Sequence, residues 1–177
     1  MMAEPNVLES RVSGAKSELP MHQRVPRLTV RSVLREKQVG LLRIDSSFRS
    51  LDALMGLAEK SLEAALVLDA GGMVGIFSLL DFARTTVGAG LSAMTMPVFD
   101  VMTPCNCLVS LDDSAQTCLT LMYENHLNFM PVQERGNVIA LLPRETLLSE
   151  MVSNYEKIFR ESALDQQILF LRGTYSC

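Results

Sequence analysis

The chain has 177 residues, of which 48% are hydrophobic, and a formal net charge of −4 at pH 7. This length and apolar content suffice for one packed domain with extensions, whereas the negative charge gives no global attraction to nucleic acid or an anionic membrane. Residues 1–22 lack the apolar core of a secretory signal, and no run approaches the roughly 18–20 apolar residues of a spanning helix. We therefore expect a cytoplasmic protein with no membrane partner.

The cysteine and histidine content argues against a metal centre. The four cysteines, which suit a reducing compartment as free thiols, are Cys105, Cys107, Cys118 and Cys177. The only histidines are His22 and His126. One C-x-C pair with a single distant cysteine partner is poor spacing for zinc, so we expect no bound metal.

Residues 1–27 are expected to form a flexible arm, because proline, glycine and scattered charges interrupt them. From residue 24 onward arginines recur at spacings of three, four and four residues, at Arg24, Arg27, Arg31 and Arg35. This spacing places them on one face of any helix that forms there. The face is either solvated and paired with acidic neighbours, which we favour, or a stripe that binds phosphate or nucleic acid. We therefore do not expect a nucleic-acid partner.

The first structured region combines short apolar strands with one amphipathic helix. Residues 41–44 read as a strand, and apolar residues at helical spacing predict a helix from about Ser47 to Lys60. The continuous apolar run 64–68 predicts a strand buried between layers. Gly71 and Gly72 then predict a hairpin turn, since glycine reaches the positive-φ conformations of such turns, and residues 73–77 form the return strand.

A serine and an aspartate stand where this return strand ends. Ser78 precedes Asp81 by three residues, the spacing at which a hydroxyl caps the first turn of a helix and a carboxylate faces its dipole. The same two groups can also hold a ribose, because a carboxylate accepts hydrogen bonds from two neighbouring sugar hydroxyls. The capping pattern is the commoner one on spacing alone, and both interpretations stay open at this point.

The region repeats itself after 65 residues. Without a gap, this offset pairs Leu54 with Leu119, Glu59 with Glu124, Leu62 with Leu127, Val67 with Val132 and Gly71 with Gly136. Each repeat reads as a helix, a buried strand, a turn, a second strand and a helix, and such units pair because one alone cannot bury its apolar face. The stretch 85–97, broken by glycine and proline, is predicted to connect them without a long helix. We expect an α/β (α+β) fold.

The motifs of the second repeat resemble one cystathionine-β-synthase (CBS) domain. They are the segments Val98-Phe99-Asp100-Val101-Met102-Thr103, Val109-Ser110 and Asn128-Phe129-Met130-Pro131-Val132, the last two separated by an amphipathic helix from about Ser114 to Asn125. Residues 28–88 resemble a more diverged copy. The resemblance implies a stand-alone Bateman module, in which two pseudo-symmetric β-α-β-β-α repeats pack through their sheets. Its parts would be an arm (1–27), a first repeat (28–88), a connector (89–97), a second repeat (98–151) and a C-terminal helical extension (152–177).

Family members act as ligand-sensing regulators, and many bind the adenosyl part of AMP, ADP, ATP, S-adenosylmethionine or NAD between their repeats. The resemblance thus implies that Ser78 and Asp81 hold a ribose. The other residues expected to form this cleft are Arg43, Ile44, Ala65, Leu66 and Arg144. The expected wall of a weaker second cleft is Leu108, Phe129, Met130 and Pro131. Such a nucleotide would be a regulatory ligand, and no cofactor is required.

The second repeat departs from the family pattern at the ribose position. The offset of 65 places Ser78 on Pro143 and Asp81 on Thr146, so both groups are replaced. Pro143 suits a first helical turn, so the fold survives, while Arg144 adds a permanent positive charge near the strand ends. We therefore expect one competent cleft, or none.

The C-terminal residues 150–172 are expected to form an extra helical region. Apolar residues recur at helical spacing in two patches, Met151, Tyr155, Ile158 and Phe159, then Leu164, Ile168, Leu169 and Leu171. A face this wide must be covered by the module itself or by another subunit. This predicts a homodimer.

The chain shows no set of residues that predicts catalysis, since it has neither a Walker loop nor an HExxH motif and its two histidines have bland settings. We therefore do not expect an enzyme. We expect a regulatory module that binds an adenine nucleotide and signals to a regulated protein partner through a conformational or assembly change. The alternative is a structural dimerisation module whose clefts are degenerate and empty.

Overall fold

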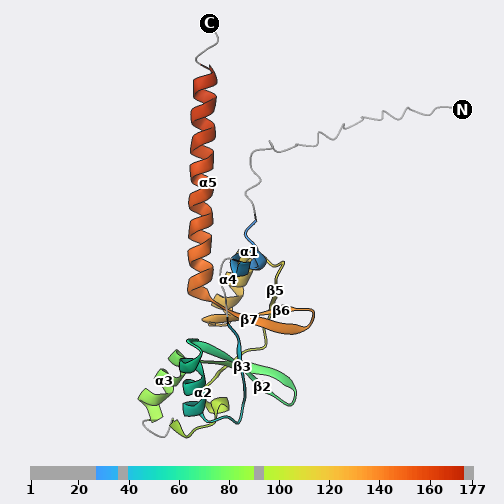
Figure 1. The fold of residues 1–177 in the computed structure, drawn as a ribbon, viewed down its shortest axis with the longest axis vertical. Coiled ribbons are helices and arrows are strands. Elements are labelled where there is room, and N and C mark those ends of the chain that lie inside the picture. Colours follow the sequence, from blue (N-terminus) through green and yellow to red (C-terminus); the bar gives the residue numbers. More distant parts are fainter. Residues whose placement is uncertain (1–26, 36–39, 90–93, 174–177) are drawn as a thin grey trace, which may run out of the picture.

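The computed structural model of the chain describes residues 27–35, 40–89 and 94–173, which form two small sheets with helices and one long terminal helix (Figure 1). The first repeat contains β1 (Leu42–Asp45), α2 (Ser50–Glu59), β2 (Ala64–Asp69), β3 (Gly72–Ser78) and α3 (Leu79–Ala89). The second contains β5 (Val109–Ser110), α4 (Ala115–Glu124), β6 (Phe129–Glu134), β7 (Asn137–Pro143) and α5 (Arg144–Gly173). The predicted mixed α/β fold with two repeats is confirmed.

The two sheets share one design. In each, the first strand pairs in parallel with the middle strand, which pairs antiparallel with the third. Val67 faces Gly75 in the first sheet and Val132 faces Ala140 in the second, and the register shifts directly after Val67 and after Val132. Both strands of each pair thus keep the offset of 65 residues, because the same order of apolar strand, turn and strand recurs at that distance.

The two hairpins close with different residues. In the first, Gly72 has φ 117°, and the Asp69 carboxylate accepts a hydrogen bond from the Gly71 N–H (2.7 Å). In the second, Arg135 and Gly136 both have positive φ, 51° and 82°. The predicted hairpins are confirmed, and glycine supplies the positive-φ conformation in each.

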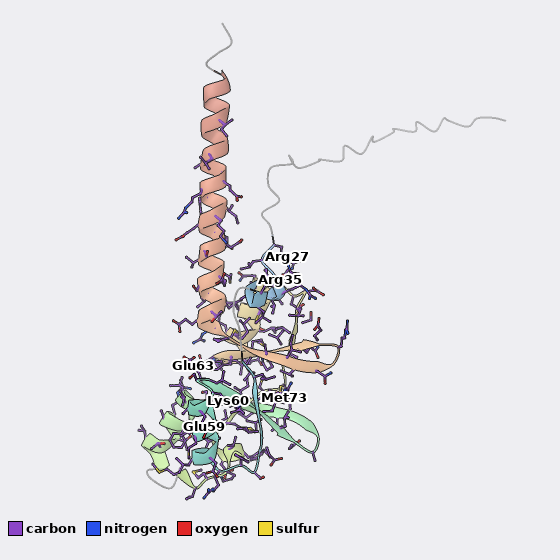
Figure 2. The ribbon with its side chains drawn as sticks, in the orientation of Figure 1. Arg27, Arg35, Glu59, Lys60, Glu63 and Met73 are labelled. Carbon is purple, nitrogen blue, oxygen red and sulfur yellow. The ribbon has the colours of Figure 1, made fainter. Side chains whose placement is uncertain are left out.

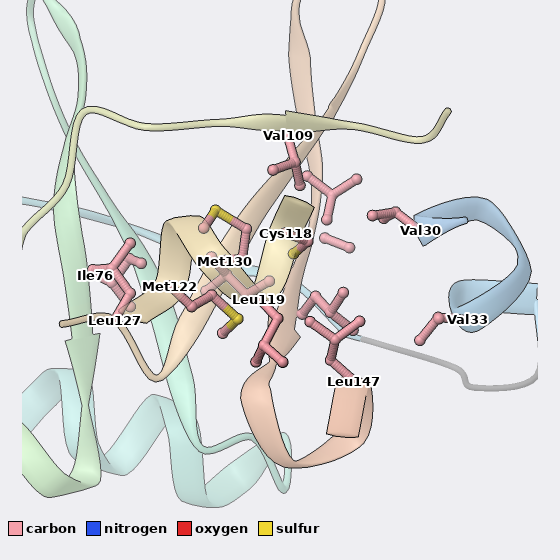
Figure 3. Close-up of a cluster of buried hydrophobic side chains, with 14 of the residues drawn as sticks. Val30, Val33, Ile76, Val109, Cys118, Leu119, Met122, Leu127, Met130 and Leu147 are labelled. Atoms are coloured by element: carbon pink, nitrogen blue, oxygen red, sulfur yellow. The ribbon is translucent and has the colours of Figure 1, made fainter. Parts of the chain in front are cut away.

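The segment that precedes the first repeat packs on the second one. The Val30 N–H of helix α1 (Val30–Arg35) donates to the Asp113 carbonyl (2.9 Å), and the Ala115 N–H donates to the Leu28 carbonyl (2.9 Å). Val30 and Val33 are buried in the core of the second repeat, beside α4 and the start of α5 (Figure 3). Helix α1 therefore completes the second repeat.

The segment that precedes the second repeat packs on the first one. The Val98 N–H, at the 3₁₀ turn η3 (Val98–Asp100), donates to the Phe48 carbonyl (2.7 Å), and the Ser50 N–H donates to the Met96 carbonyl (2.9 Å). Strand β4 (Thr103–Pro104) pairs with β3 at the edge of the first sheet. Each repeat is thus completed by the segment leading into the other one, which ties the two together.

Two helix predictions need correction. Helix α3 continues through residues 85–89, which were predicted to belong to a broken connector, because the Thr85 and Thr86 hydroxyls donate back to the Asp81 and Phe82 carbonyls (3.0 and 2.8 Å) and leave the helix intact. The C-terminal region is one uninterrupted helix with the last helix of the second repeat, α5, which has 30 residues. Within the described residues, no helix combines the length and apolar character needed to cross a membrane.

Gly75 allows β4 to approach the first sheet. A Cβ at this position would lie 2.6 Å from the Met102 Sδ and 2.7 Å from the Thr103 carbonyl oxygen. Gly75→Ala should therefore push β4 away and lower the free energy of unfolding by about 1–3 kcal/mol, measured by urea denaturation. Gly88→Ala is the matched control: it meets open space on a helix and should be neutral or stabilise by up to about 1 kcal/mol. Equal stability of both variants would show that β4 yields without cost.

Candidate functional site

Ser78 and Asp81 cap the start of α3 reciprocally. The Asp81 Oδ2 accepts hydrogen bonds from the Ser78 N–H (3.0 Å) and the Ser78 hydroxyl (2.6 Å), while the Asp81 N–H donates to the Ser78 Oγ (3.2 Å). Both side chains are buried. The interpretation of this pair as a helix start is therefore confirmed.

The Asp81 carboxylate also connects the helix to the segment between the repeats. The Thr103 hydroxyl on β4 donates to the Asp81 Oδ1 (2.8 Å). A carboxylate offers about four acceptor positions, of which three are used here. Asp81 therefore organises two hydroxyl groups from separate segments and keeps one acceptor position.

These side chains line a small cavity, here called the seam cavity, at the junction of the two repeats. Its walls are Ile76, Ser78, Asp81, Thr103 and the turn His126–Phe129 between α4 and β6. Its volume is about 10 Å³, which is close to the space of one water molecule. A nucleotide would therefore have to displace the 126–129 turn or β4 in order to enter.

A larger hollow of about 720 Å³, here called the helix cleft, lies at the starts of α3 and α5. Its walls are Glu63, Ser78, Leu79, Leu80, Asn128, Phe129, Arg144, Glu145, Leu148, Ser149 and Val152. The Leu79 N–H donates to the Glu63 carbonyl (3.1 Å), and the Arg144 N–H donates to the Asn128 carbonyl (2.8 Å), the same bond 65 residues later. The helix cleft thus lies across the pseudo-symmetry of the module, and it shares Ser78, Asn128 and Phe129 with the seam cavity.

Arg144 lines the helix cleft, not the seam cavity that contains Asp81. Its guanidinium carbon lies 5.6 Å from the centre of the Tyr123 ring, a cation–π distance. The predicted positive charge near the strand ends is therefore present, on the side of the helices.

Most other predicted cleft residues line neither hollow. Ala65, Leu66, Met130 and Pro131 are buried in β2 and β6, the central strands of their sheets, which are covered on both faces. Arg43 is exposed and donates to the Val138 carbonyl (2.6 Å), a bond between the two repeats. Ile44 packs in the core of the first repeat, and Leu108 is partly exposed beside β5. Of the predicted second wall, only Phe129 lines a hollow.

Three residues of the two hollows were missed from the sequence: Thr103, His126 and Asn128. Thr103 belongs to the motif that marks the start of the second repeat, but only the pairing of β4 with β3 brings it to Asp81. His126 was interpreted as a polar residue at a helix end. It follows the end of α4 with φ 54°, a left-handed conformation that turns the chain into the seam cavity.

The arginine face forms salt bridges where it is described. Arg31 lies 3.0 Å from the Asp112 carboxylate and 3.9 Å from that of Glu134. The favoured interpretation, a solvated face paired with acidic neighbours, is therefore confirmed for Arg31. Arg24 lies outside the described residues.

Cys118 is a core residue, as predicted, and burial raises the pKa values of Cys105 and Cys118 to about 12. Cys105, Cys107 and Cys118 are free thiols, and the described part of the chain holds no group of three residues placed to bind a metal ion. Cys177 and His22 lie outside the described residues.

The comparisons with known proteins point to one family. No family model matches the chain. The CBS domain-containing protein CBSCBSPB2 of Arabidopsis thaliana is 31% identical over 117 residues, which are 66% of this chain and 22% of that protein. The first curated relatives are much longer, and the matched segment covers between 22% and 29% of their length.

Solved structures agree with this similarity. The CBS domain NE2398 superposes with a TM-score of 0.61 at 26% identity, covering 71% of this chain and 98% of that one. CBSX2, solved in complex with AMP, superposes with a TM-score of 0.53 at 22% identity, covering 71% of this chain and 97% of that one. The repeat, the two matching sheets and these relatives together identify the chain as a tandem CBS-domain protein.

Proposed function

We propose that this chain is a regulatory module that binds an adenine nucleotide in the seam cavity, with Asp81 and Ser78 holding the ribose. The observation that carries the proposal is the Asp81 carboxylate, which is buried between the repeats and already accepts hydrogen bonds from two hydroxyl groups. Neighbouring ribose hydroxyls present the same donor chemistry. The complex of CBSX2 with AMP supports an adenine nucleotide as the ligand of this fold.

Entry of the ligand exchanges equivalent bonds. A ribose hydroxyl can take the place of the Thr103 hydroxyl on Asp81 Oδ1, so one hydroxyl–carboxylate bond replaces another at small net cost. Thr103 lies on β4, which pairs with β3 at only two positions, Gly75 with Pro104 and Ile76 with Thr103. This short strand is therefore the wall that can move most cheaply.

Occupancy can be transmitted through shared walls. Ser78, Asn128 and Phe129 line both the seam cavity and the helix cleft. A ligand that widens the seam cavity therefore shifts a wall of the helix cleft, and it does so only as far as it binds the open arrangement better than the closed one. A protein partner that contacts the helix cleft would sense the nucleotide in this way.

One observation favours a second function, a structural dimerisation module. The seam cavity measures about 10 Å³, and the Asp81 carboxylate already accepts three hydrogen bonds within the protein. A module of this kind would need no ligand, and its clefts would stay closed.

A thermal-shift screen separates the two functions. AMP, ADP, ATP, NAD and S-adenosylmethionine are each added to the full chain, and a compound at a hundred times its dissociation constant should stabilise the fold by about 2.7 kcal/mol. The 2′,3′-dideoxy analogue of the active nucleotide is the matched control and should give a much smaller shift, because it lacks the hydroxyls that Asp81 would accept. No shift with any compound at millimolar concentration would overturn the proposal and leave the structural module.

A further inference from the structure

Helix α5 carries an exposed apolar stripe, here called the α5 stripe, formed by Leu148, Val152, Tyr155 and Phe159. The residues are spaced by four, three and four, which places them within about 60° of one another around the helix. Their exposed fractions rise from 37% at Leu148 to 73% at Phe159, where the helix has left the body of the protein (Figures 1 and 2). Large apolar side chains in such a row mark an interaction surface.

The α5 stripe begins inside the helix cleft. Leu148 and Val152 line that cleft, together with Leu79 and Leu80 at the start of α3, which are 47% and 44% exposed. The cleft is therefore an open, largely apolar hollow at the base of the stripe. Its 720 Å³ exceeds the volume of one aromatic side chain several times over.

The spacing of the α5 stripe is the same in both directions along the helix. Two copies of α5 in antiparallel orientation, related by a two-fold axis level with residues 153 and 154, would place Leu148 opposite Phe159 and Val152 opposite Tyr155. Leu148 and Phe159 are 11 residues apart, about 16 Å along the helix. Phe159 of each copy would then lie at the level of the helix cleft of the other, so that each chain supplies both a projecting side chain and the hollow that receives it.

The charges beside the stripe fit the same orientation. Glu145 and Arg160 flank the α5 stripe on one side, at opposite ends. An antiparallel two-fold arrangement brings the same flanks together, so Arg160 of each copy would meet Glu145 of the other. A parallel arrangement would place Arg160 beside the other flank, which carries Ile158. The present contact of Arg160, 4.0 Å from the Glu156 carboxylate on the exposed surface, is cheap to exchange.

We propose that two copies of this chain associate through antiparallel α5 helices, with Phe159 of each seated in the helix cleft of the other. The occupant of the cleft is a second copy because the stripe, the hollow and the flanking charges are complementary to themselves under one two-fold rotation. The association requires no nucleotide and stands independently of the proposed ligand site.

The test uses the full chain in sedimentation velocity between 1 and 100 µM. The wild type should form a dimer, and Phe159→Glu should weaken it roughly 100-fold or more, because two desolvated aromatic contacts are lost per dimer. Leu164→Glu is the matched control: Leu164 is 58% exposed on the opposite side of α5 and should leave the dimer unchanged. Circular dichroism should show the same thermal midpoint for the diluted monomers of both variants, since both positions are exposed.

Charge exchange tests the orientation. Arg160→Glu and Glu145→Arg should each weaken the dimer several-fold, and the double variant should restore it. A wild type that is monomeric at 100 µM, or a dimer unaffected by Phe159→Glu, would overturn the proposed interface. A dimer that Phe159→Glu disrupts but that the double charge variant fails to restore would overturn the antiparallel arrangement.

Discussion

Replacing Val30 and Val33 together by alanine should lower the free energy of unfolding by about 3–5 kcal/mol. Both side chains are almost completely buried, at 0% and 1% exposure, against the core of the second repeat. Each substitution removes two buried methyl groups and leaves a cavity, and buried aliphatic truncations of this kind cost a few kcal/mol each. The effect is large because α1 has only six residues and these two are its buried ones.

The matched control is Val87→Ala, the same exchange at a position that is 90% exposed on α3. It should change the free energy of unfolding by no more than about 0.5 kcal/mol. Urea denaturation followed by circular dichroism measures all variants. If the double variant were as stable as Val87→Ala, helix α1 would not be part of the second repeat.

The repeated core could be predicted from the sequence because its signals are local. The offset of 65 residues, the apolar runs and the glycine turns each act within a few residues, and they placed both hairpins and the helices between them. The end of α3 was misplaced because glycine at an exposed helix end costs little, and side-chain hydrogen bonds to the backbone compensate for the threonines there.

The crossed packing of the two leading segments could not be predicted in this way. Val30 and Val33 read as ordinary apolar residues, and nothing in their spacing tells which repeat they cover. The same holds for Thr103, whose hydroxyl reaches Asp81 only because β4 adds to the sheet of the other repeat. These contacts depend on tertiary pairing between segments 22 residues or more apart.

The predicted site illustrates the same limit. Ser78 and Asp81 were found because a three-residue spacing fixes their contact, and the structure joins them as expected. Ala65 and Leu66 were assigned to a cleft because small side chains leave room beside a strand. Yet β2 is the central strand of its sheet and is covered on both faces, so these residues lie in the core.

Asp81→Asn should weaken nucleotide binding by about 1–3 kcal/mol, roughly 5- to 150-fold in affinity, because the ribose hydroxyls lose a charged acceptor. The fold should tolerate the change. The asparagine Oδ1 can keep the hydrogen bond from the Ser78 N–H, and its amide can donate to the Thr103 hydroxyl oxygen. The variant thus separates the charge of Asp81 from its structural contacts.

Asp69→Asn is the control with the same change of charge in the same repeat. Asp69 lies at the exposed β2–β3 turn, where its carboxylate accepts a hydrogen bond from the Gly71 N–H that an amide oxygen can also accept. Nucleotide affinity should stay at the wild-type value. A loss in this variant as large as that in Asp81→Asn would mean that net charge, and not the seam cavity, governs binding.

Isothermal titration calorimetry of the wild type, Asp81→Asn and Asp69→Asn with the most stabilising nucleotide decides whether Asp81 holds the ligand. We expect saturable binding to the wild type and to Asp69→Asn with equal affinity, and a 5- to 150-fold weaker interaction with Asp81→Asn at unchanged thermal stability. Equal affinity of the wild type and Asp81→Asn would contradict a ribose site at the seam cavity.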